Sequence, residues 1–506
     1  MKYRAAVLLA AAVFACTAAV KAEFDGYIVS FPDESRADAA MEYMEKNAIV
    51  DENMYRLTDR GFLYHFSDEA LIKTFDELGL IEYYEENEII VPDFGEEMPK
   101  EVPNLASLFA SASHYQWSHE LCHTKTAWKL GVTGKGTTLL VIDSGVQAAH
   151  EDLAGAVLGG KDYNSTSDEA TTPADYSPRT IFNPGNREYY HGTMVTGFAM
   201  ARYNGFGVTG VAPDASVYMA RCINDGGGVP IAKAAVAISE AGQLGADVIN
   251  MSFGKEGRDR GLDDAVSWAV EDGVILAAAA GNNYNGTEIQ YPASCDGAIS
   301  VAACGSGGTW SGYTRNLYVC ITAPGVSVWS TKASPESTSL YSSGSGTSYS
   351  SPFVAGAALL AKSVDKSITP AHFKELLTQT ADKSVLKGAR RTDKFGYGII
   401  DVGALITALL NEKYDKLYVG PLFHDYDDGS DSVTLLNTTD EPMRFDAVIA
   451  AYDAGGKMTG TVAGKVDCDP GELAEFDVTP LDVPGKTVKL FTFKDMRPCA
   501  APYILQ

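Results

Sequence analysis

The chain has 506 residues, enough for about three domains at the usual size of roughly 150 residues. Hydrophobic residues make up 45% and charged residues 21%, a globular composition that excludes disorder or collagen-like repeats for the bulk of the chain. With 40 basic and 66 acidic residues the formal net charge is −26, which argues against binding to nucleic acid or to anionic membranes.

The pattern of a secretory signal peptide occupies residues 1–22. Two basic residues precede an alanine-rich apolar run over 5–19, and Val20 and Ala22 are the small residues that a signal peptidase reads. The run is shorter than the ~20 residues of a membrane-spanning helix. We therefore expect a secreted, extracellular protein with no membrane span; a lipid anchor on Cys16 is an alternative that fits the preceding residues poorly.

Residues 23–92 predict a small α+β unit. Residues 27–31 and 62–66 are strand-like, each is followed by a helix-like run, and an apolar pair at 89–90 closes the segment. The composition then loosens over 93–114, where we expect a linker that contains a processing site.

Strand and helix signals alternate over residues 115–412. This alternation predicts an α/β domain with a parallel sheet, helices on both faces and functional groups at the carboxyl ends of the strands. The clearest strands are expected at 138–142, 247–251 and 274–277, and the clearest helices at 231–243 and 261–271.

The last segment, residues 418–506, changes character. It contains β-rich runs around a turn signal at 453–456 and predicts a β-sandwich of about 90 residues. The β-rich runs are at 432–436, 445–452 and 487–493. Nothing in the sequence indicates an oligomeric state.

Three short motifs carry the chemistry. Asp143 directly follows a buried strand, His191-Gly192 opens a helix of small residues, and Ser348 lies at the start of a helix, with Pro352 in its expected first turn. Each motif alone has an ordinary alternative: a turn, a surface histidine or a serine-rich helix cap. Together they are the groups of nucleophilic catalysis, because a hydroxyl needs a base and the base needs an orienting acid.

A fourth polar side chain is expected at the same edge of the sheet. The run Ala277-Ala278-Ala279-Ala280 ends in Gly281-Asn282, which places an amide donor beside the helix that begins at Ser348. Such an amide, together with the backbone N–H of the serine, stabilises a developing oxyanion.

These motifs, in the chain order Asp, His, Ser, resemble those of the subtilisin-like serine proteases, and the resemblance covers residues 115–410. It implies that Asp143 orients His191, that His191 is the general base and then acid, that Ser348 is the nucleophile and that Asn282 is the oxyanion donor. It also implies protein or peptide substrates and no catalytic cofactor.

The resemblance extends to the flanking parts. Residues 23–92 resemble the inhibitory propeptide of the family, which implies a self-processed zymogen with its own propeptide as partner. Ser252-Phe253-Gly254 resembles the strand that pairs with the substrate backbone. Gln290 stands where the first specificity pocket has its floor, and we expect a shallower pocket, less suited to large aromatic side chains.

Two segments resemble the structural calcium site of the family. Asp152 and Asn204 would supply side-chain oxygens, with backbone carbonyls completing the site. A turn cap is the alternative for Asp152. The chain also departs from the family pattern: Met194 replaces a frequent second histidine, and Arg202 and Tyr203 alter the calcium loop.

Two alternatives to an active endopeptidase stay open. One is a catalytically restricted or silent relative that acts as a binding or adhesion protein through residues 418–506, against which the intact set of motifs argues. The other is a processing protease of the kexin type, which would need an acidic pocket, and no clear acidic set lies near 252–254.

The cysteines and histidines give weaker signals. Removal of the signal peptide leaves seven of the eight cysteines, and nearness in sequence suggests the pairs Cys304–Cys320 and Cys468–Cys499. Three histidines cluster beside Cys122, where a solvated polar segment is favoured over a metal site; they are His114, His119 and His123.

Overall fold

The computed structural model describes residues 24–58, 60–90, 116–164, 177–178, 187–224, 227–333, 340–494, 497–498 and 501–505. The expected signal peptide and the expected linker at 93–114 lie outside these residues, as do His114 and Cys499. Within the described part of the chain, no helix is both long enough and apolar enough to cross a bilayer.

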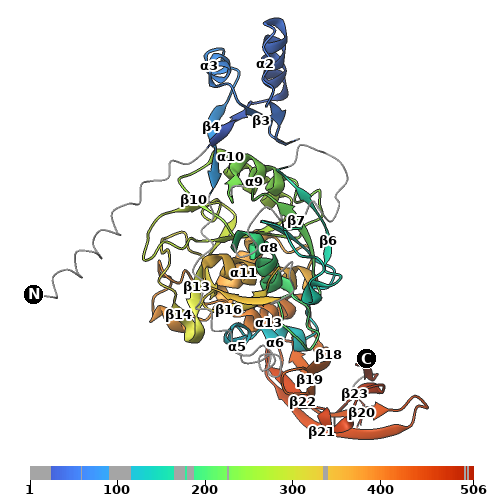
Figure 1. Cartoon of the computed structure of the whole chain (residues 1–506). Helices are drawn as coiled ribbons and strands as arrows, with labels where there is room; N and C mark the ends of the chain where they lie inside the picture. Colours follow the sequence, from blue (N-terminus) through green and yellow to red (C-terminus); the bar gives the residue numbers. More distant parts are fainter. Residues whose placement is uncertain are drawn as a thin grey trace, which may run out of the picture. The chain divides into compact units, whose positions relative to one another are not determined.

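Residues 24–90 form an α+β unit of four antiparallel strands in the order β2-β3-β1-β4, drawn in blue in Figure 1. Asp33 and Asp68 cap the two helices by accepting hydrogen bonds from backbone N–H groups. The core contains a cluster of aromatic rings from Phe31, Phe66 and Phe75. The elements are β1 (Phe24–Ser30), α2 (Glu34–Lys46), β2 (Tyr55–Arg56), β3 (Leu63–Phe66), α3 (Glu69–Glu77) and β4 (Tyr83–Ile90).

The middle of the chain is built on an eight-stranded sheet in the order β14-β13-β11-β9-β5-β7-β6, with β15 also paired to β13. All pairs are parallel except β13–β14. The strands are β5 (Thr138–Asp143), β6 (Val157–Asp162), β7 (Ser216–Arg221), β9 (Val248–Met251), β11 (Ile275–Ala279), β13 (Ala298–Gly305), β14 (Thr309–Trp310) and β15 (Ile321–Pro324).

Helices surround this sheet, and α11 packs against β9, β11, β13 and β15. Its apolar and small residues fit that place, since Thr347–Lys362 are all buried. At Gly356 a Cβ atom would lie 2.9 Å from the carbonyl oxygen of Ala199, so glycine is what lets α8 approach. The helices are α5 (Trp117–Leu121), α6 (Thr124–Lys129), α8 (Arg187–Met200), α9 (Ile231–Ser239), α10 (Arg260–Glu271), α11 (Thr347–Val364), α12 (Pro370–Thr380) and α13 (Val402–Lys413).

Short elements complete this domain around the sheet. Two-stranded sheets join β10 to β12 and β16 to β17. The remaining elements are β8 (Val229–Pro230), β10 (Lys255–Glu256), β12 (Gln290–Tyr291), β16 (Val328–Thr331), β17 (Tyr341–Gly344) and the 3₁₀ turns η2 (Glu151–Leu153), η3 (Ser306–Gly308) and η4 (Ser384–Leu386).

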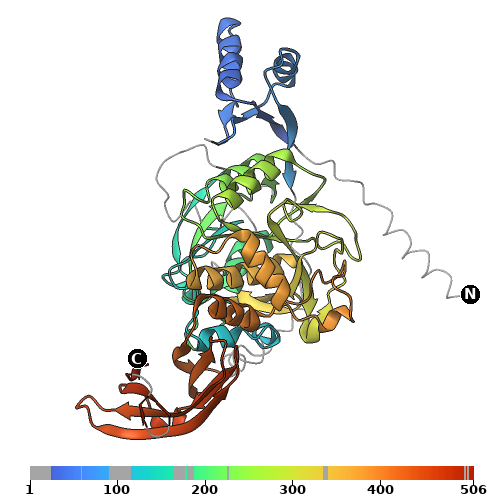
Figure 2. The same ribbon diagram turned by 180° about the vertical axis from the view of Figure 1, so that it is seen from behind.

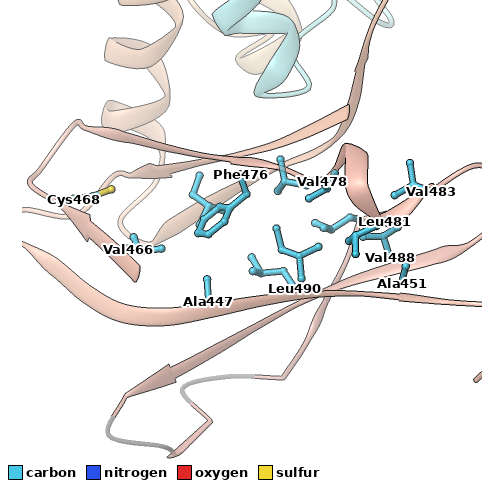
Figure 3. Packing of buried hydrophobic residues seen from close by; sticks show 14 residues of the cluster. Ala447, Ala451, Val466, Cys468, Phe476, Val478, Leu481, Val483, Val488 and Leu490 are labelled. Atoms are coloured by element: carbon cyan, nitrogen blue, oxygen red, sulfur yellow. The ribbon is translucent and has the colours of Figure 1, made fainter. Parts of the chain in front are cut away.

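The C-terminal residues form two antiparallel sheets, β18-β19-β22 and β21-β20-β23-β24, with β25 on β23; Figure 2 shows them from behind in orange and red. Side chains from both sheets meet in one core, where Phe476 and Val478 pack with Ala447 and Leu490 (Figure 3). The elements are β18 (Leu417–Asp425), β19 (Ser430–Asn437), β20 (Met443–Tyr452), β21 (Met458–Cys468), β22 (Leu473–Asp477), η5 (Thr479–Leu481), β23 (Thr487–Lys494), β24 (Arg497–Pro498) and β25 (Tyr503–Ile504).

The predicted cysteine pairing is wrong for Cys304 and Cys320, which are both buried and free. Cys320 precedes β15, and its backbone N–H donates to the carbonyl oxygen of Ser300. Cys304 is the register partner of Pro324, at the other end of the parallel pair β13–β15. Four residues along a strand separate the two thiols by about 13 Å, beyond the reach of a disulfide. Cys468 is also free.

Candidate active site

Three neighbouring strands bring polar residues to one edge of the sheet. Asp143 is the last residue of β5, Ser252 directly follows β9, and Asn282 follows β11. The strands are parallel, and Met251 lies level with both Ile142 and Ala278. Their carboxyl ends therefore coincide, as expected from the βα alternation.

Asp143 and His191 form a buried pair. The imidazole Nδ1 lies 2.9 Å from Oδ2 and 3.0 Å from Oδ1 of Asp143, and both side chains are at most 2% exposed. The carboxylate also accepts the backbone N–H of Ser144 at 2.7 Å. Because a carboxylate only accepts, Nδ1 carries the proton and Nε2 carries the lone pair.

Glycine is required beside this pair. A Cβ atom at Gly192 would lie 2.4 Å from the carbonyl oxygen of Gly145 and 3.0 Å from Oδ1 of Asp143. The prediction that His191 opens its helix is wrong, because α8 begins at Arg187. His191 is therefore held within a formed helix turn rather than at its frayed end.

Ser348 is the second residue of α11 and is buried, at the end of the helix where backbone N–H groups point outward. Its Oγ donates to the carbonyl oxygen of Ser252 at 3.1 Å. Pro352 is the sixth residue of the helix, not part of its first turn as predicted. Since proline has no N–H, it leaves the carbonyl of Ser348 without its helix donor, and Ser252 Oγ donates to that carbonyl at 2.8 Å.

Asn282 is held by a residue that the sequence analysis did not single out. The backbone N–H and the hydroxyl of Thr347 donate to Asn282 Oδ1 at 2.8 and 2.9 Å. The same hydroxyl accepts the N–H of Gly281 at 3.1 Å. These bonds fix which end of the amide faces Thr347, so the NH₂ end points elsewhere. The sequence motif Gly346-Thr347-Ser348 contains Thr347, but nothing in it indicates that Asn282 is the partner of this threonine.

A cavity of about 200 Å³ lies beside these groups. It brings together the predicted residues Ser252, Phe253, Gly254, Gln290, Asn282 and Ser348. Gln290 pairs with Glu256 across the two short strands β10 and β12, and Asn283 Nδ2 donates to Glu256 at 3.3 Å. Glu256 and Asn283 also line the cavity and were missed, because strand pairing between segments so far apart is not visible in the sequence.

Asp152 and Asn204 lie together, away from the catalytic edge. Asn204 Nδ2 donates to Asp152 Oδ1 at 3.1 Å, and the N–H of Val208 donates to Oδ2 at 2.8 Å. Burial raises the pKa of the Asp152 carboxyl to about 6. A Cβ atom at Gly207 would lie 2.1 Å from Oδ2, so glycine keeps room beside the carboxylate.

These residues fit a calcium ion in their chemistry. A buried carboxylate and a side-chain amide are hard oxygen donors, and a cation would offset the cost of burying the negative charge of Asp152. Asn204 would have to turn its oxygen toward the ion. Among the described residues, no group of three His, Cys, Asp or Glu side chains is arranged to hold a metal.

The solvated interpretation of the histidine cluster fits His123, whose side chain is 61% exposed, but not His119. His119 is buried, its Nε2 lies 2.9 Å from the carbonyl oxygen of Thr209, and its ring packs on Trp128. His123 instead pairs with Asp401, with Nδ1 2.9 Å from Oδ2. The favoured interpretation is therefore wrong for His119, and the two histidines have separate partners.

Residues 134–398 match the subtilase family. An alkaline protease of Alkalihalobacillus alcalophilus is 30% identical over 383 residues, which cover 73% of this chain and 93% of that protein. The chain belongs to the subtilase family. Thermitase of Thermoactinomyces vulgaris is 35% identical over 273 residues, covering 54% of this subtilase and 90% of thermitase.

Two further comparisons extend this result. The minor extracellular protease Epr of Bacillus subtilis (strain 168) is 32% identical over 293 residues, which are 58% of this subtilase but only 42% of Epr. The crystal structure of fervidolysin from Fervidobacterium pennivorans has a TM-score of 0.62 at 20% identity, over 96% of this chain and 74% of that one. The predicted fold class and the predicted enzyme class, a subtilisin-like serine endopeptidase, are confirmed.

Proposed function

We propose that this subtilase hydrolyses peptide bonds through an acyl-enzyme on Ser348, with His191 as base and Asp143 as its orienting acid. The observation that carries the proposal is the buried Asp143–His191 pair, in which a carboxylate fixes Nδ1 and leaves the lone pair on Nε2. That tautomer is the one a general base needs.

The reaction proceeds in two halves. His191 Nε2 takes the hydroxyl proton as Ser348 Oγ attacks the peptide carbonyl, and the oxyanion is stabilised by the amide of Asn282 and the N–H of Ser348. The imidazolium then gives its proton to the leaving amine, and the acyl-enzyme forms. A water molecule, deprotonated by His191, releases the acid product and restores Ser348.

The protein is proposed to be made as a secreted zymogen. Residues 1–22 serve as signal peptide and residues 23–92 as an inhibitory propeptide that the enzyme removes from the catalytic domain (115–412) and the C-terminal β-domain (418–506). The similarity to the minor extracellular protease Epr supports secretion.

Self-processing provides the test of the proposed mechanism. Purified precursor should shorten with time, while Ser348→Ala should stay at full length. Ser350→Ala is the matched control: it lies two residues further along α11, and its hydroxyl donates to Ala323 at 3.1 Å rather than serving the chemistry. It should process like the wild type. Wild-type precursor that stays intact over a range of pH and calcium concentrations would instead favour a silent relative that binds through its β-domain.

The specificity pocket is proposed to disfavour large aromatic side chains. Gln290 and Glu256 are paired in register on β12 and β10, and both residues line the cavity. Burying a phenyl ring against them would leave polar groups without water. A peptide library should show weak cleavage after Phe and Tyr; strong preference for either residue would refute the assignment.

Calcium is proposed as a structural ion at Asp152 and Asn204, with no part in the chemistry. When bound, it would supply positive charge beside the buried carboxylate of Asp152. The residues themselves hold the loop at 202–208 onto η2, through the hydrogen bonds that Asn204 and Val208 give to Asp152.

A further inference from the structure

The side chain of Tyr349 lies along one face of the helix that carries the base. Its ring is 5.8 Å from the ring of His191 and 5.9 Å from that of Phe198, and its hydroxyl donates to Met194 Sδ at 3.9 Å. His191, Met194 and Phe198 are spaced by three and four residues, so they form a single stripe of α8. Tyr349 is 2% exposed.

Strand β17 lies close against the hydroxyl end of this ring. A Cβ atom at Gly344 would lie 2.5 Å from both Cε2 and Cζ of Tyr349, closer than real side chains approach one another. The ring therefore fits only because residue 344 is glycine. We call Tyr349 a wedge because its ring lies against both the backbone of β17 and the His191 face of α8.

We infer that Tyr349 is a positioning residue for catalysis: its ring sets the place of the His191 imidazole relative to the Ser348 hydroxyl. The inference rests on the proposed function of Ser348 and His191. Tyr349 suits this task because it is bonded directly to the nucleophile on one side and touches the base on the other.

The physical need for such a wedge follows from the rest of the site. Asp143 holds the imidazole at Nδ1, and the place of Nε2 also depends on how the ring can swing about that contact. Packing on the ring face restricts this swing. A displacement of about 1 Å between base and nucleophile costs on the order of 10²-fold in rate, so a loose imidazole would be costly.

The wedge also accounts for Met194, which departs from the family pattern. The thioether fills the space beside the phenol and its Sδ accepts a hydrogen bond from the phenol hydroxyl, where an imidazole would be more rigid and more polar. A hydrogen bond to sulfur is weak. The ring, rather than the hydroxyl, should therefore perform the positioning.

The test compares three variants: Tyr349→Phe, Tyr349→Leu and Phe353→Leu. Phe353 is the matched control, because it is a fully buried aromatic residue on the same helix and its ring packs on His119 instead. The measurement is kcat per active site, counted by stoichiometric acylation of Ser348, together with KM for a short peptide substrate. Counting active sites removes any loss that is due to unfolded enzyme.

We expect Tyr349→Leu to lower kcat about 10- to 100-fold with KM within about twofold, while Tyr349→Phe stays within about threefold of the wild type. Phe353→Leu should lower the melting temperature but leave kcat per site nearly unchanged. A kcat in Tyr349→Leu that matches the wild type, or an equal loss in Phe353→Leu, overturns the inference.

A second variant covers the case in which Tyr349→Leu does not fold. Gly344→Ala crowds the ring of Tyr349 and displaces it, so this variant should also lower kcat per active site. Full activity per active site in Gly344→Ala contradicts the inference. Failure of the proposed function looks different: the wild type would not acylate at position 348, or His191→Ala would keep full activity.

Discussion

Tyr203 joins the loop at 202–208 to the C-terminal β-domain, and its removal should weaken the whole catalytic unit. Its ring stacks on Phe423, with ring centroids 5.6 Å apart and an interplanar angle of 10°. It also contacts Tyr426 edge-on and Trp128 at a tilt, with centroid distances of 5.1 and 5.3 Å. The hydroxyl accepts the N–H of Tyr426 at 3.0 Å and donates to Asp425 at 3.4 Å.

The cost of Tyr203→Ala can be worked out from these contacts. Each aromatic pair contributes about 0.5–1.5 kcal/mol beyond burial, and truncating a large aromatic residue costs about 3–5 kcal/mol when it is fully buried. Since Tyr203 is half-buried, we expect a loss of about 3 kcal/mol in the free energy of unfolding. Tyr203→Phe keeps the ring and should cost only about 1 kcal/mol.

Calorimetry and urea unfolding of these variants in a Ser348→Ala background, which prevents self-digestion, would measure this cost. We expect the β-domain and the catalytic domain to unfold together in the parent and in two separated transitions after Tyr203→Ala. Tyr452→Ala is the control, because this half-buried tyrosine lies in the β-domain beside Lys489. If Tyr203→Ala costs no more than Tyr203→Phe, or if the parent already shows two independent transitions, the coupling is refuted.

Three further outcomes are expected. Burial lowers the pKa of His119 from 6.5 to about 4. Its contribution to the free energy of unfolding is therefore fully present above pH 6.5, and on the order of 3 kcal/mol is lost as the pH drops toward 4. Thermal melts across this range should show this pH dependence in the wild type but not in His119→Gln. Asn282→Ala should lower kcat by ~10²–10³, the loss known for such a donor in subtilisin, with little change in KM. Chelator should lower the melting temperature of the wild type, and Asp152→Asn should remove the difference between melts with and without calcium.

Much of the fold was predictable because parallel strands buried on both faces are continuous apolar runs. β5 and β9 match their predicted ranges to within one residue, and β11 is shifted by one to two residues. The polar residues that follow these strands were predictable for the same reason, since a hydrophilic residue after an apolar run marks the edge of the sheet. Asp143 and Asn282 were therefore found without coordinates.

What the sequence did not reveal depends on contacts between distant segments. The role of Thr347 needs Asn282 beside it, 65 residues earlier in the chain. The helix that carries His191 was expected to begin at the histidine, because the small residues that signal it start there, yet α8 begins at Arg187. Pro352 was expected in the first turn of its helix, because proline is unfavourable further inside. In the structure, the hydroxyl of Ser252 donates to the carbonyl oxygen of Ser348, which Pro352 leaves without its helix donor.

The departures from the family pattern have a common physical explanation. The Sδ atom of Met194 accepts a hydrogen bond from the hydroxyl of Tyr349, and the ring of Tyr203 stacks on Phe423 of the β-domain. Arg202 donates to the carbonyl oxygens of Pro213 and Ala215 at 2.6 and 2.9 Å. Each altered residue thus has a partner elsewhere in this chain, so restoring the family residue at one position alone would leave that partner unsatisfied.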